Sequence, residues 1–266
     1  MAKIAHYIIT RFNLRSDASS VRAIDPAWLD RRFALFDQFC LPTIKSQTLL
    51  DFRWLLLFDS ETPPSARRRI EELAQWKNIS VIFMEAGAED VGRAAVLMAM
   101  QEPPDILLTT RLDNDDGLAS DYVETIRRFC DVSERTVLEF PVGYVWWEGR
   151  AYRDRQLRNP FVTLVEPLHT DSAPTFSTVY RGAHHESYKL GHVVEVSQEP
   201  GWLQVVHGGN LANRQRGVRE PVSSLRGRFA LDDALLAGKE SAMGLALDAI
   251  RTRIVEEARR VWHRVK

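Results

Sequence analysis

The sequence predicts an α/β fold in which a mostly parallel, Rossmann-like β-sheet is flanked by helices. First, short apolar segments alternate with segments of helical periodicity through the first half of the chain, which gives a βαβαβαβ series. Second, the fourth apolar segment runs into a cluster of carboxylates at residues 113–116, and open α/β sheets bind ligands outside the carboxyl ends of their strands. Third, 266 residues with 45% hydrophobic and 27% charged residues can bury a large core, as one large domain or two small ones.

The elements of this series follow from apolar runs and helical periodicity. Strands are expected at residues 6–12, 52–59, 79–84 and 106–108. Helices are expected at residues 26–39, which begin with Pro26, and at residues 63–76 and 89–100. After residue 136 the pattern changes to a strand-like segment at 136–147, polar and aromatic loops, and a short strand at 203–206.

Composition narrows the class of protein. A net charge of -1 gives no global electrostatic case for binding nucleic acid, and no apolar run is long enough to span a membrane. Cys40 and Cys130 lack metal-ligand spacing and are interpreted as buried thiols in a reducing compartment. The N-terminal segment is too polar for a secretory signal, so we expect a cytoplasmic protein.

The acidic run after the fourth strand predicts a cation site. Asp113, Asp115 and Asp116 repel one another and raise each other's pKa values, so a site that keeps them ionised most simply contains a divalent cation. Carboxylate oxygens are hard ligands, which suit Mg²⁺ or Mn²⁺. The alternative is a solvated acidic turn that caps a helix starting near Leu118, with Asp116 or Ser120 as the N-cap.

Three segments carry a family resemblance. HYIITRFN (6–13), FALFDQFCLPTIKSQTLLDFRWLLLFD (33–59) and RLDNDDGL (111–118) resemble the rhamnosyltransferase family of GT-A-type glycosyltransferases. The resemblance covers roughly the first half of the chain. It implies a GT-A-like fold, a nucleotide-diphosphate sugar donor, and a divalent cation bound at a DXD motif. Asn114 stands where the family often has Asp, so the carboxylates that touch the metal are left open.

The resemblance assigns donor-side roles to residues at the strand ends. It implies that Asp113 and Asp115 contact metal and ribose. If the segment is extended, these two side chains point to the same side and Asn114 points away. Asp116 is interpreted as a helix cap. Arg111 is expected to contact a phosphate, or to form a structural salt bridge.

Further donor contacts are expected from the first two strands and from the segment 203–214. By resemblance, Arg11, Asn13 and Asp59 would contact base and ribose, whereas the alternative for Asp59 is a turn or N-cap acid. His207 follows a short strand and, by resemblance, would complete the metal shell; an ordinary hydrogen-bonded turn histidine is the alternative. The remaining residues expected to contact diphosphate oxygens, or to cap the turn, are Asn210 and Arg214.

The second half of the chain is expected to bind the acceptor. An inverting transferase needs a carboxylate base, for which Glu186 is preferred over Asp171, with Glu166 as a third candidate. The side chains expected to line the acceptor site are His184, His185, Tyr188 and Trp147. For Trp147, packing in the core is the alternative.

We expect two regions, a catalytic domain at residues 1–235 and a helical extension at 236–266. Within the first, residues 1–135 would bind the nucleotide and 136–235 the acceptor. The extension carries an apolar stripe and a basic face, which suits peripheral contact with an anionic membrane and a lipid-linked or glycan acceptor; packing on the catalytic domain is the alternative. Two other functions stay open, a sugar-phosphate nucleotidyltransferase and a non-catalytic nucleotide- or glycan-binding protein.

Overall fold

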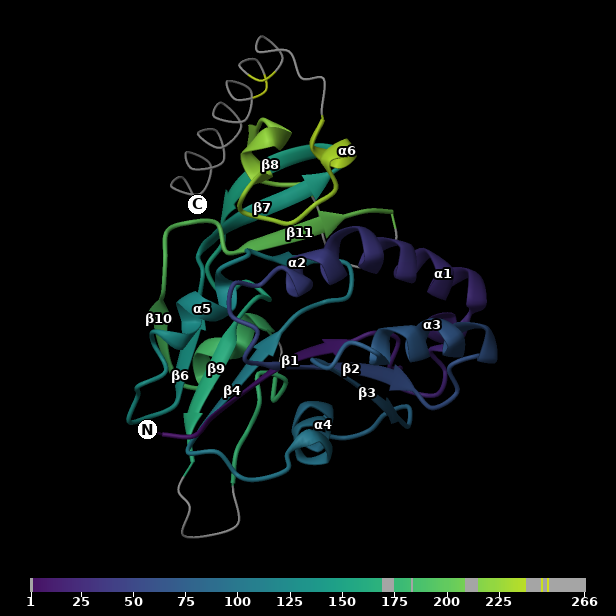
Figure 1. The fold of residues 1–266 in the computed structure, drawn as a ribbon, viewed down its shortest axis with the longest axis vertical. Helices are drawn as coiled ribbons and strands as arrows, with labels where there is room; N and C mark the ends of the chain where they lie inside the picture. The colour runs from purple at the N-terminus through teal and green to yellow at the C-terminus, as the bar shows by residue number, and fades with distance from the viewer. Residues whose placement is uncertain are drawn as a thin grey trace, which may run out of the picture.

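A seven-stranded sheet forms the centre of the molecule in the computed structural model (Figure 1), which describes residues 2–168, 175–182, 184–208, 215–237, 245 and 248. The strand order is β10-β6-β9-β4-β1-β2-β3. Strands β1 to β4 are mutually parallel, β9 is antiparallel to β4 and β6, and β10 is parallel to β6. The bounds are Ile4–Arg11 (β1), Arg53–Asp59 (β2), Ile79–Met84 (β3), Ile106–Arg111 (β4), Thr136–Glu139 (β6), Thr163–Pro167 (β9) and His192–Glu195 (β10).

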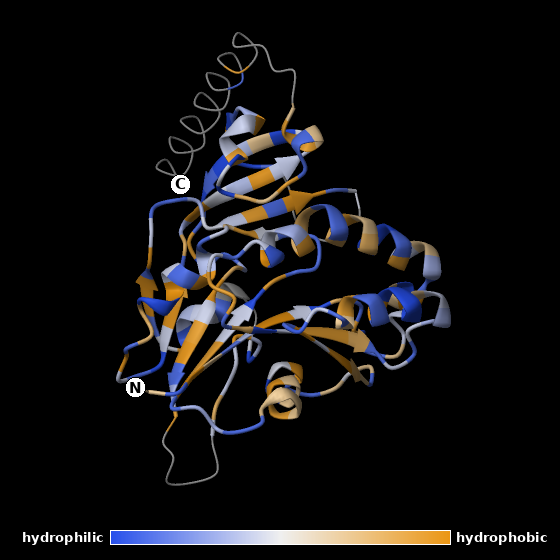
Figure 2. Cartoon of the chain, viewed as in Figure 1, coloured by the Kyte–Doolittle hydropathy of each residue, from blue (hydrophilic) through white to orange (hydrophobic). Residues whose placement is uncertain are grey.

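Helices cover both faces of this sheet. Ile8 of β1 packs in the cluster that includes Leu29 and Ile70, whereas its neighbour Ile9 packs with Val96, so alternate residues of the strand face opposite helical layers. Figure 1 shows α1 and α3 on one side and α4 on the other, and Figure 2 shows hydrophobic residues concentrated along the strands. The α-helices are Pro26–Leu35 (α1), Leu41–Lys45 (α2), Pro64–Ala74 (α3), Val91–Ala99 (α4), Tyr122–Arg127 (α5) and Asp233–Leu236 (α6).

The predicted α/β fold with a mostly parallel sheet is therefore confirmed. Helix α1 begins as expected, because Pro26 occupies its first turn and the Asp25 carboxylate accepts a hydrogen bond from the Trp28 amide. It ends earlier than expected, since the chain passes through a π-helical turn, Phe36–Cys40 (η2), before α2. The 3₁₀ segments are Val21–Ile24 (η1), His184–Lys189 (η3) and Val222–Leu225 (η4).

A second, five-stranded sheet has the order β12-β8-β7-β11-β5. Its bounds are Gly117–Leu118 (β5), Val142–Trp147 (β7), Arg150–Arg155 (β8), Trp202–Val206 (β11) and Val218–Glu220 (β12). The Trp202 ring lies flat on Gly143, where an added Cβ would come within 2.0 Å of the ring, and it stacks on Phe161 at 5.1 Å. This packing fixes β11 against β7, and β11 leads directly to His207.

Two expectations from the sequence meet a different outcome. The helix expected near Leu118 is wrong, because Gly117 and Leu118 pair with β11 and the helix α5 begins only at Tyr122. The extension at 236–266 lies almost entirely outside the described residues. Its boundary with the catalytic domain stays a prediction.

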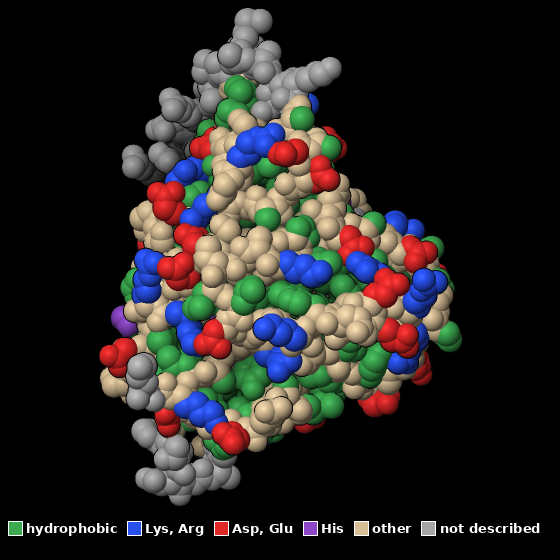
Figure 3. Space-filling view, in the orientation of Figure 1, with side chains coloured by type: hydrophobic (Ala, Val, Ile, Leu, Met, Phe, Trp, Pro, Cys, Tyr) green, Lys and Arg blue, Asp and Glu red, His purple; other side chains and the backbone are tan. Residues whose placement is uncertain are grey.

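Basic and acidic side chains are intermixed on the face of the molecule shown in Figure 3, which has no large patch of like charge. Among the described residues, none of the helices has the length and apolar character needed to cross a membrane.

Candidate active site

The acidic residues after β4 lie in a turn. The Asp116 amide donates to the Asp113 carbonyl at 3.3 Å, so the chain reverses direction here instead of continuing as a strand. The expectation that an extended segment aligns Asp113 with Asp115 is therefore wrong. Each carboxylate of the turn instead faces its own set of partners.

Asp115 contacts two cationic or polar groups that come from distant parts of the chain. Its Oδ2 accepts a hydrogen bond from Arg32 Nη1 at 2.6 Å and lies 2.8 Å from His207 Nε2, which donates because an ionised carboxylate can only accept. Burial alone would raise the pKa of Asp115, but the hydrogen bond from His207 and the charge of Arg32 hold this pKa below its usual range. The structure thus brings together two of the three residues expected at the metal.

Asp116 connects the turn to the five-stranded sheet. Its Oδ1 accepts a hydrogen bond from the Val205 amide of β11 at 2.8 Å, and its side chain is buried. The expected role of Asp116 or Ser120 as a helix cap is wrong, because the N-cap of α5 is Asp121. Burial, together with the charges of its acidic neighbours, raises the pKa of Asp116 well above its usual range. Asp116 therefore positions β11, and with it His207.

Asp113 is more exposed than Asp115, whereas Arg111, at 19%, is about as exposed as Arg32, at 17%. Asp113 Oδ1 lies 3.4 Å from Arg111 Nη2, and the Asp113 side chain is 41% exposed. The Arg111 guanidinium packs over the ring of Tyr180, 5.4 Å from its centroid, and among the described residues its Nε has no hydrogen-bond partner. Asn114 donates to the Phe12 carbonyl at 2.7 Å, and its Oδ1 accepts from Arg32 Nη1 at 3.3 Å, so Asn114 and Asp115 share this arginine. The exposed Asp113 carboxylate can thus contact a ligand, and the Arg111 guanidinium lies beside it.

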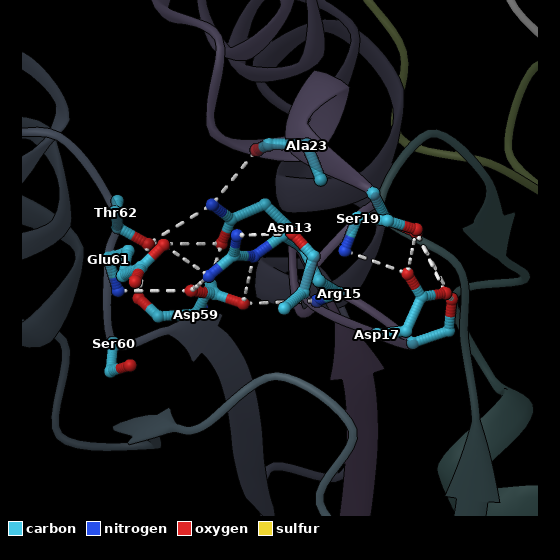
Figure 4. A network of polar contacts seen from close by, with 12 residues as sticks. Asn13, Arg15, Asp17, Ser19, Ala23, Asp59, Ser60, Glu61 and Thr62 are labelled. Carbon is cyan, nitrogen blue, oxygen red and sulfur yellow. Dashed lines mark hydrogen bonds and ion pairs between the residues drawn. The ribbon is translucent and has the colours of Figure 1, made fainter.

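Strands β1 and β2 end in a closed polar network (Figure 4). Arg15 Nε and Nη2 donate to the two carboxylate oxygens of Asp59 at 2.9 and 3.0 Å, and Asp59 is fully buried. Burial favours the neutral carboxyl, but the bonds from Arg15 outweigh it and keep the pKa of Asp59 low. Asp59 also accepts from the Glu61 amide at 3.0 Å, which is the turn contact given above as its alternative role.

The same network holds the loop after β1. Asn13 Nδ2 donates to the Ala23 carbonyl and to Thr62 Oγ1, both at 3.1 Å, so this side chain ties the loop to the end of β2. Arg11 is exposed at the end of β1. The sequence reasoning missed Arg15, although an arginine that follows one parallel strand and an aspartate that follows its neighbour are a recognisable signal.

The acceptor candidates lie in different places. Trp147 ends β7 opposite Val206, so it comes close to His207, and it also packs against the main core. Glu186 pairs with Lys189, and Tyr188 packs under Arg158 at 4.2 Å, both on η3. The strand that follows η3 along the chain is β10. In the sheet, β10 is separated from β4, the strand that leads to the acidic turn, by three strand spacings, roughly 14 Å.

Several candidates are not placed by the structure. Three of the candidates lie outside the described part of the chain, namely Asp171, Asn210 and Arg214. The side chains of His184 and His185 are also not described. Glu166 is described: it is buried in β9 opposite Leu107, toward the start of β4, where it accepts from the Ser177 amide and from Arg135. This position is at the other end of β4 from the acidic turn, which argues against Glu166 as the base.

A comparison with solved structures found similarity to two glycosyltransferase structures, among others. S. aureus TarS residues 1–349 in complex with UDP matches with a TM-score of 0.46 and 14% identity over 77% of this chain and 60% of that one. The mannosyltransferase PcManGT from Pyrobaculum calidifontis, in complex with GDP-Man and Mn²⁺, matches with a TM-score of 0.42 and 10% identity over 79% of this chain and 58% of that one. The chain thus spans about 60% of the length of these proteins.

No curated protein sequence matches the chain significantly. The family model described as "Putative rhamnosyl transferase" matches residues 10–219, which include the ends of β1, β2 and β4 as well as His207. This range is more than half of the chain. The chain therefore belongs to the "Putative rhamnosyl transferase" family.

Proposed function

We propose that the chain is a metal-dependent glycosyltransferase that moves a sugar, rhamnose, from a nucleotide diphosphate to a hydroxyl group of a glycan or lipid-linked acceptor. The observation that carries this proposal is the 2.8 Å contact between His207 and Asp115. It joins an acid at the carboxyl end of a parallel strand to an imidazole that comes from the second sheet. Family membership supports the transfer of a sugar.

The residues fit a hard divalent cation. Among the described residues no group of three His, Cys, Asp or Glu is arranged as a complete metal shell. Mg²⁺ and Mn²⁺ sites, however, commonly use one or two protein ligands and complete their shell with water and substrate phosphates. Asp115 and His207 would hold the ion if the proton that His207 now donates to Asp115 were displaced, and the lowered pKa of Asp115 keeps its carboxylate ionised. The bound cation would stabilise the charge of the departing diphosphate.

The open residues at the strand ends are the proposed donor contacts. Asp113 and Arg111 would contact ribose and phosphate, and Arg11 lies exposed at the end of the neighbouring strand. We propose that Asn13 and Asp59 serve the donor site indirectly, because they hold the loop that borders it. Asn210 and Arg214, which lie outside the described residues, complete the proposed diphosphate contacts.

The transfer forms one bond and breaks another. The acceptor hydroxyl oxygen bonds to the anomeric carbon, the bond from that carbon to the diphosphate oxygen breaks, and its electron pair leaves with the nucleoside diphosphate. The hydroxyl proton passes to a base, for which Glu186 and Asp171 remain our candidates if the enzyme inverts. The proposed acceptor contacts are His184, His185, Tyr188 and Trp147.

The proposed location is the cytoplasm. Cys40 and Cys130 are free thiols, which suits a reducing compartment. Peripheral contact with a membrane through residues 236–266 is also proposed.

Calorimetry tests the proposed function. The full chain is titrated with UDP, GDP and dTDP, with and without Mn²⁺, and Asp115→Asn is compared with Asp131→Asn, which changes an exposed acid on the loop after α5. We expect one nucleotide to bind in a Mn²⁺-dependent manner and only the Asp115 variant to lose this dependence. Nucleotide binding that ignores both Mn²⁺ and the Asp115 substitution would refute the proposal.

A further inference from the structure

A cavity of about 500 Å³ opens beside Asp115, on the side of helix α1. It is lined by Arg22, Trp28, Arg31, Arg32, Ala34, Leu35, His207 and Gly208. Arg32 and His207 also hydrogen-bond Asp115. The cavity is therefore continuous with the proposed catalytic centre.

The cavity lining is rich in arginine, and two of its arginines lack an acidic partner among the described residues. Three arginines and a histidine line the cavity, and none of its described lining residues is an acid. Arg22 and Arg31 are exposed, and neither has an acidic partner among the residues that the structure describes. A cavity of similar volume at the opposite ends of the strands contrasts with it, because there the cations Lys3, Arg53 and Lys77 are accompanied by the acids Asp51 and Glu102.

The cavity also has a fixed aromatic wall. The Asp25 carboxylate caps α1 through the Trp28 amide at 2.8 Å, which fixes the first turn of the helix. The Arg32 guanidinium lies 5.1 Å from the centre of the Trp28 ring, so the indole and the cation are held together. An aromatic surface beside convergent charged groups is how protein sites orient a small polar ligand.

We propose that this cavity binds the acceptor, and that the acceptor is an anionic sugar whose phosphate or carboxylate group contacts Arg22 and Arg31. The proposal rests on the proposed transferase function. Asp115 faces this cavity through Arg32 and His207, whereas Asp113 faces Arg111 and Tyr180. The turn therefore separates a cationic acceptor side from the donor side.

Two arginines can be removed without touching the proposed metal ligands. Calorimetry of the full chain uses glucose 6-phosphate, glucuronate, glucose and inorganic phosphate as probes, which separates a phosphate-bearing from a carboxylate-bearing sugar. The variants are Arg22→Gln and Arg31→Gln, and the matched control is Arg128→Gln, which changes an exposed arginine of the α5 end. We expect one of the anionic sugars to bind about tenfold or more tightly than glucose and inorganic phosphate, and each cavity variant to weaken this binding about tenfold.

The same variants distinguish this inference from the proposed function. Mn²⁺-dependent nucleotide binding should stay at the parental value in both cavity variants and in the control. Loss of nucleotide binding in the Arg22 or Arg31 variants would assign the cavity to the donor and overturn the inference, as would equal binding of glucose and both anionic sugars. If the parent binds an anionic sugar through these arginines but never binds a nucleotide, the proposed function fails while the anionic sugar site stands.

Discussion

Two arginine–aspartate pairs at the carboxyl ends of neighbouring strands, Arg15–Asp59 and Arg32–Asp115, differ in how far they are buried. In the Arg15–Asp59 pair, after β1 and β2, the side chains are 5% and 0% exposed and two parallel hydrogen bonds join them. In the Arg32–Asp115 pair, the side chains are 17% and 7% exposed, and Arg32 shares one carboxylate oxygen with His207. A cavity adjoins only the second of these pairs among the cavities described above.

This difference in enclosure indicates that the two arginine–aspartate pairs have different roles. A bidentate pair that is fully enclosed satisfies both charges and fixes backbone, but it offers no atom to a ligand. An acid that shares one oxygen between an arginine and a histidine beside a cavity keeps its charge and can exchange a partner. We therefore infer that Asp59 mainly fixes the loop after β1, whereas Asp115 mainly serves catalysis.

The largest effect is expected at the open pair. Asp115→Asn should lower kcat/KM by about 10³-fold, because a group that holds charge-stabilising cations contributes several kcal/mol to the transition state. Unfolding free energy should fall by only about 1 kcal/mol, since Arg32 can turn toward the cavity and water. Steady-state kinetics and urea unfolding measure the two quantities, and a variant that unfolds readily but turns over normally would reverse the assignment.

The closed pair should show the opposite balance. Asp59→Asn leaves Arg15 buried without its full countercharge, so the free energy of unfolding should fall by about 3–5 kcal/mol. Donor affinity of the folded fraction should change much less. Arg69→Gln is the matched control, because it breaks the more exposed Arg69–Asp37 pair, and it should cost less than about 1 kcal/mol.

A double variant refines this test. Replacing both partners, Arg15→Met with Asp59→Leu, should cost less than the single Asp59 change because no buried charge is left alone. Should Asp59→Asn instead retain full stability and lose only nucleotide binding, Asp59 would be a direct donor contact and the comparison between the two pairs would fail.

The buried His6 has no ion-pair partner among the described residues, and it makes the stability depend on pH. His6 is buried, contacts Thr110 Oγ1 through Nε2 at 2.8 Å, and its pKa is lowered to about 3, first by burial and then by the charge of Arg127. The unfolded chain binds this proton near pH 6.5, whereas the folded chain does not bind it until about pH 3. Below pH 6.5 the unfolding free energy should therefore fall by about 1.4 kcal/mol per pH unit from this group alone.

Chemical denaturation between pH 5 and 8 measures that slope. His6→Gln keeps a polar side chain that cannot titrate, so its stability should be flatter with pH in the window from about 6.5 to 5. Parallel curves for the parent and the His6 variant in this window would show that His6 takes up its proton in the folded state. The lowered pKa values of Asp59 and Asp115 act at more acidic pH, where stability is lost as these groups are protonated.

The sequence predicted the parallel strands and the residues at their ends better than the partners of those residues. Strand periodicity predicted that Asp59, Asp115 and His207 each lie at or just after the end of a strand, and the structure agrees. It could not predict Arg32, because the acid that a helix arginine meets depends on how α1 packs across the sheet. It gave the turn after β4 only as an alternative to an extended segment, since the hydrogen bond between the Asp116 amide and the Asp113 carbonyl cannot be seen in the residue pattern.

The five-stranded sheet escaped prediction for a related reason. Its strand β5 has only two residues, too few for a periodic signal, and it is recognised only through pairing with β11. Strand β11 in turn lies parallel to β7, which is far away in the sequence. Such pairings come from tertiary packing, here around Trp202 and Gly143, which a pattern along the chain does not encode.

The smallest effect is expected at Asp116, the immediate neighbour of Asp115. Its raised pKa indicates that the carboxyl is readily protonated, and its main contact is as acceptor for the Val205 amide, a bond that an asparagine oxygen can also accept. Asp116→Asn should therefore change the unfolding free energy by less than about 1 kcal/mol and kcat/KM by less than about fivefold. Kinetics of the two asparagine variants, made side by side, measure the contrast. A loss at Asp116 as large as that at Asp115 would mean that the whole turn, and not the carboxylate shared with His207, holds the reactive centre.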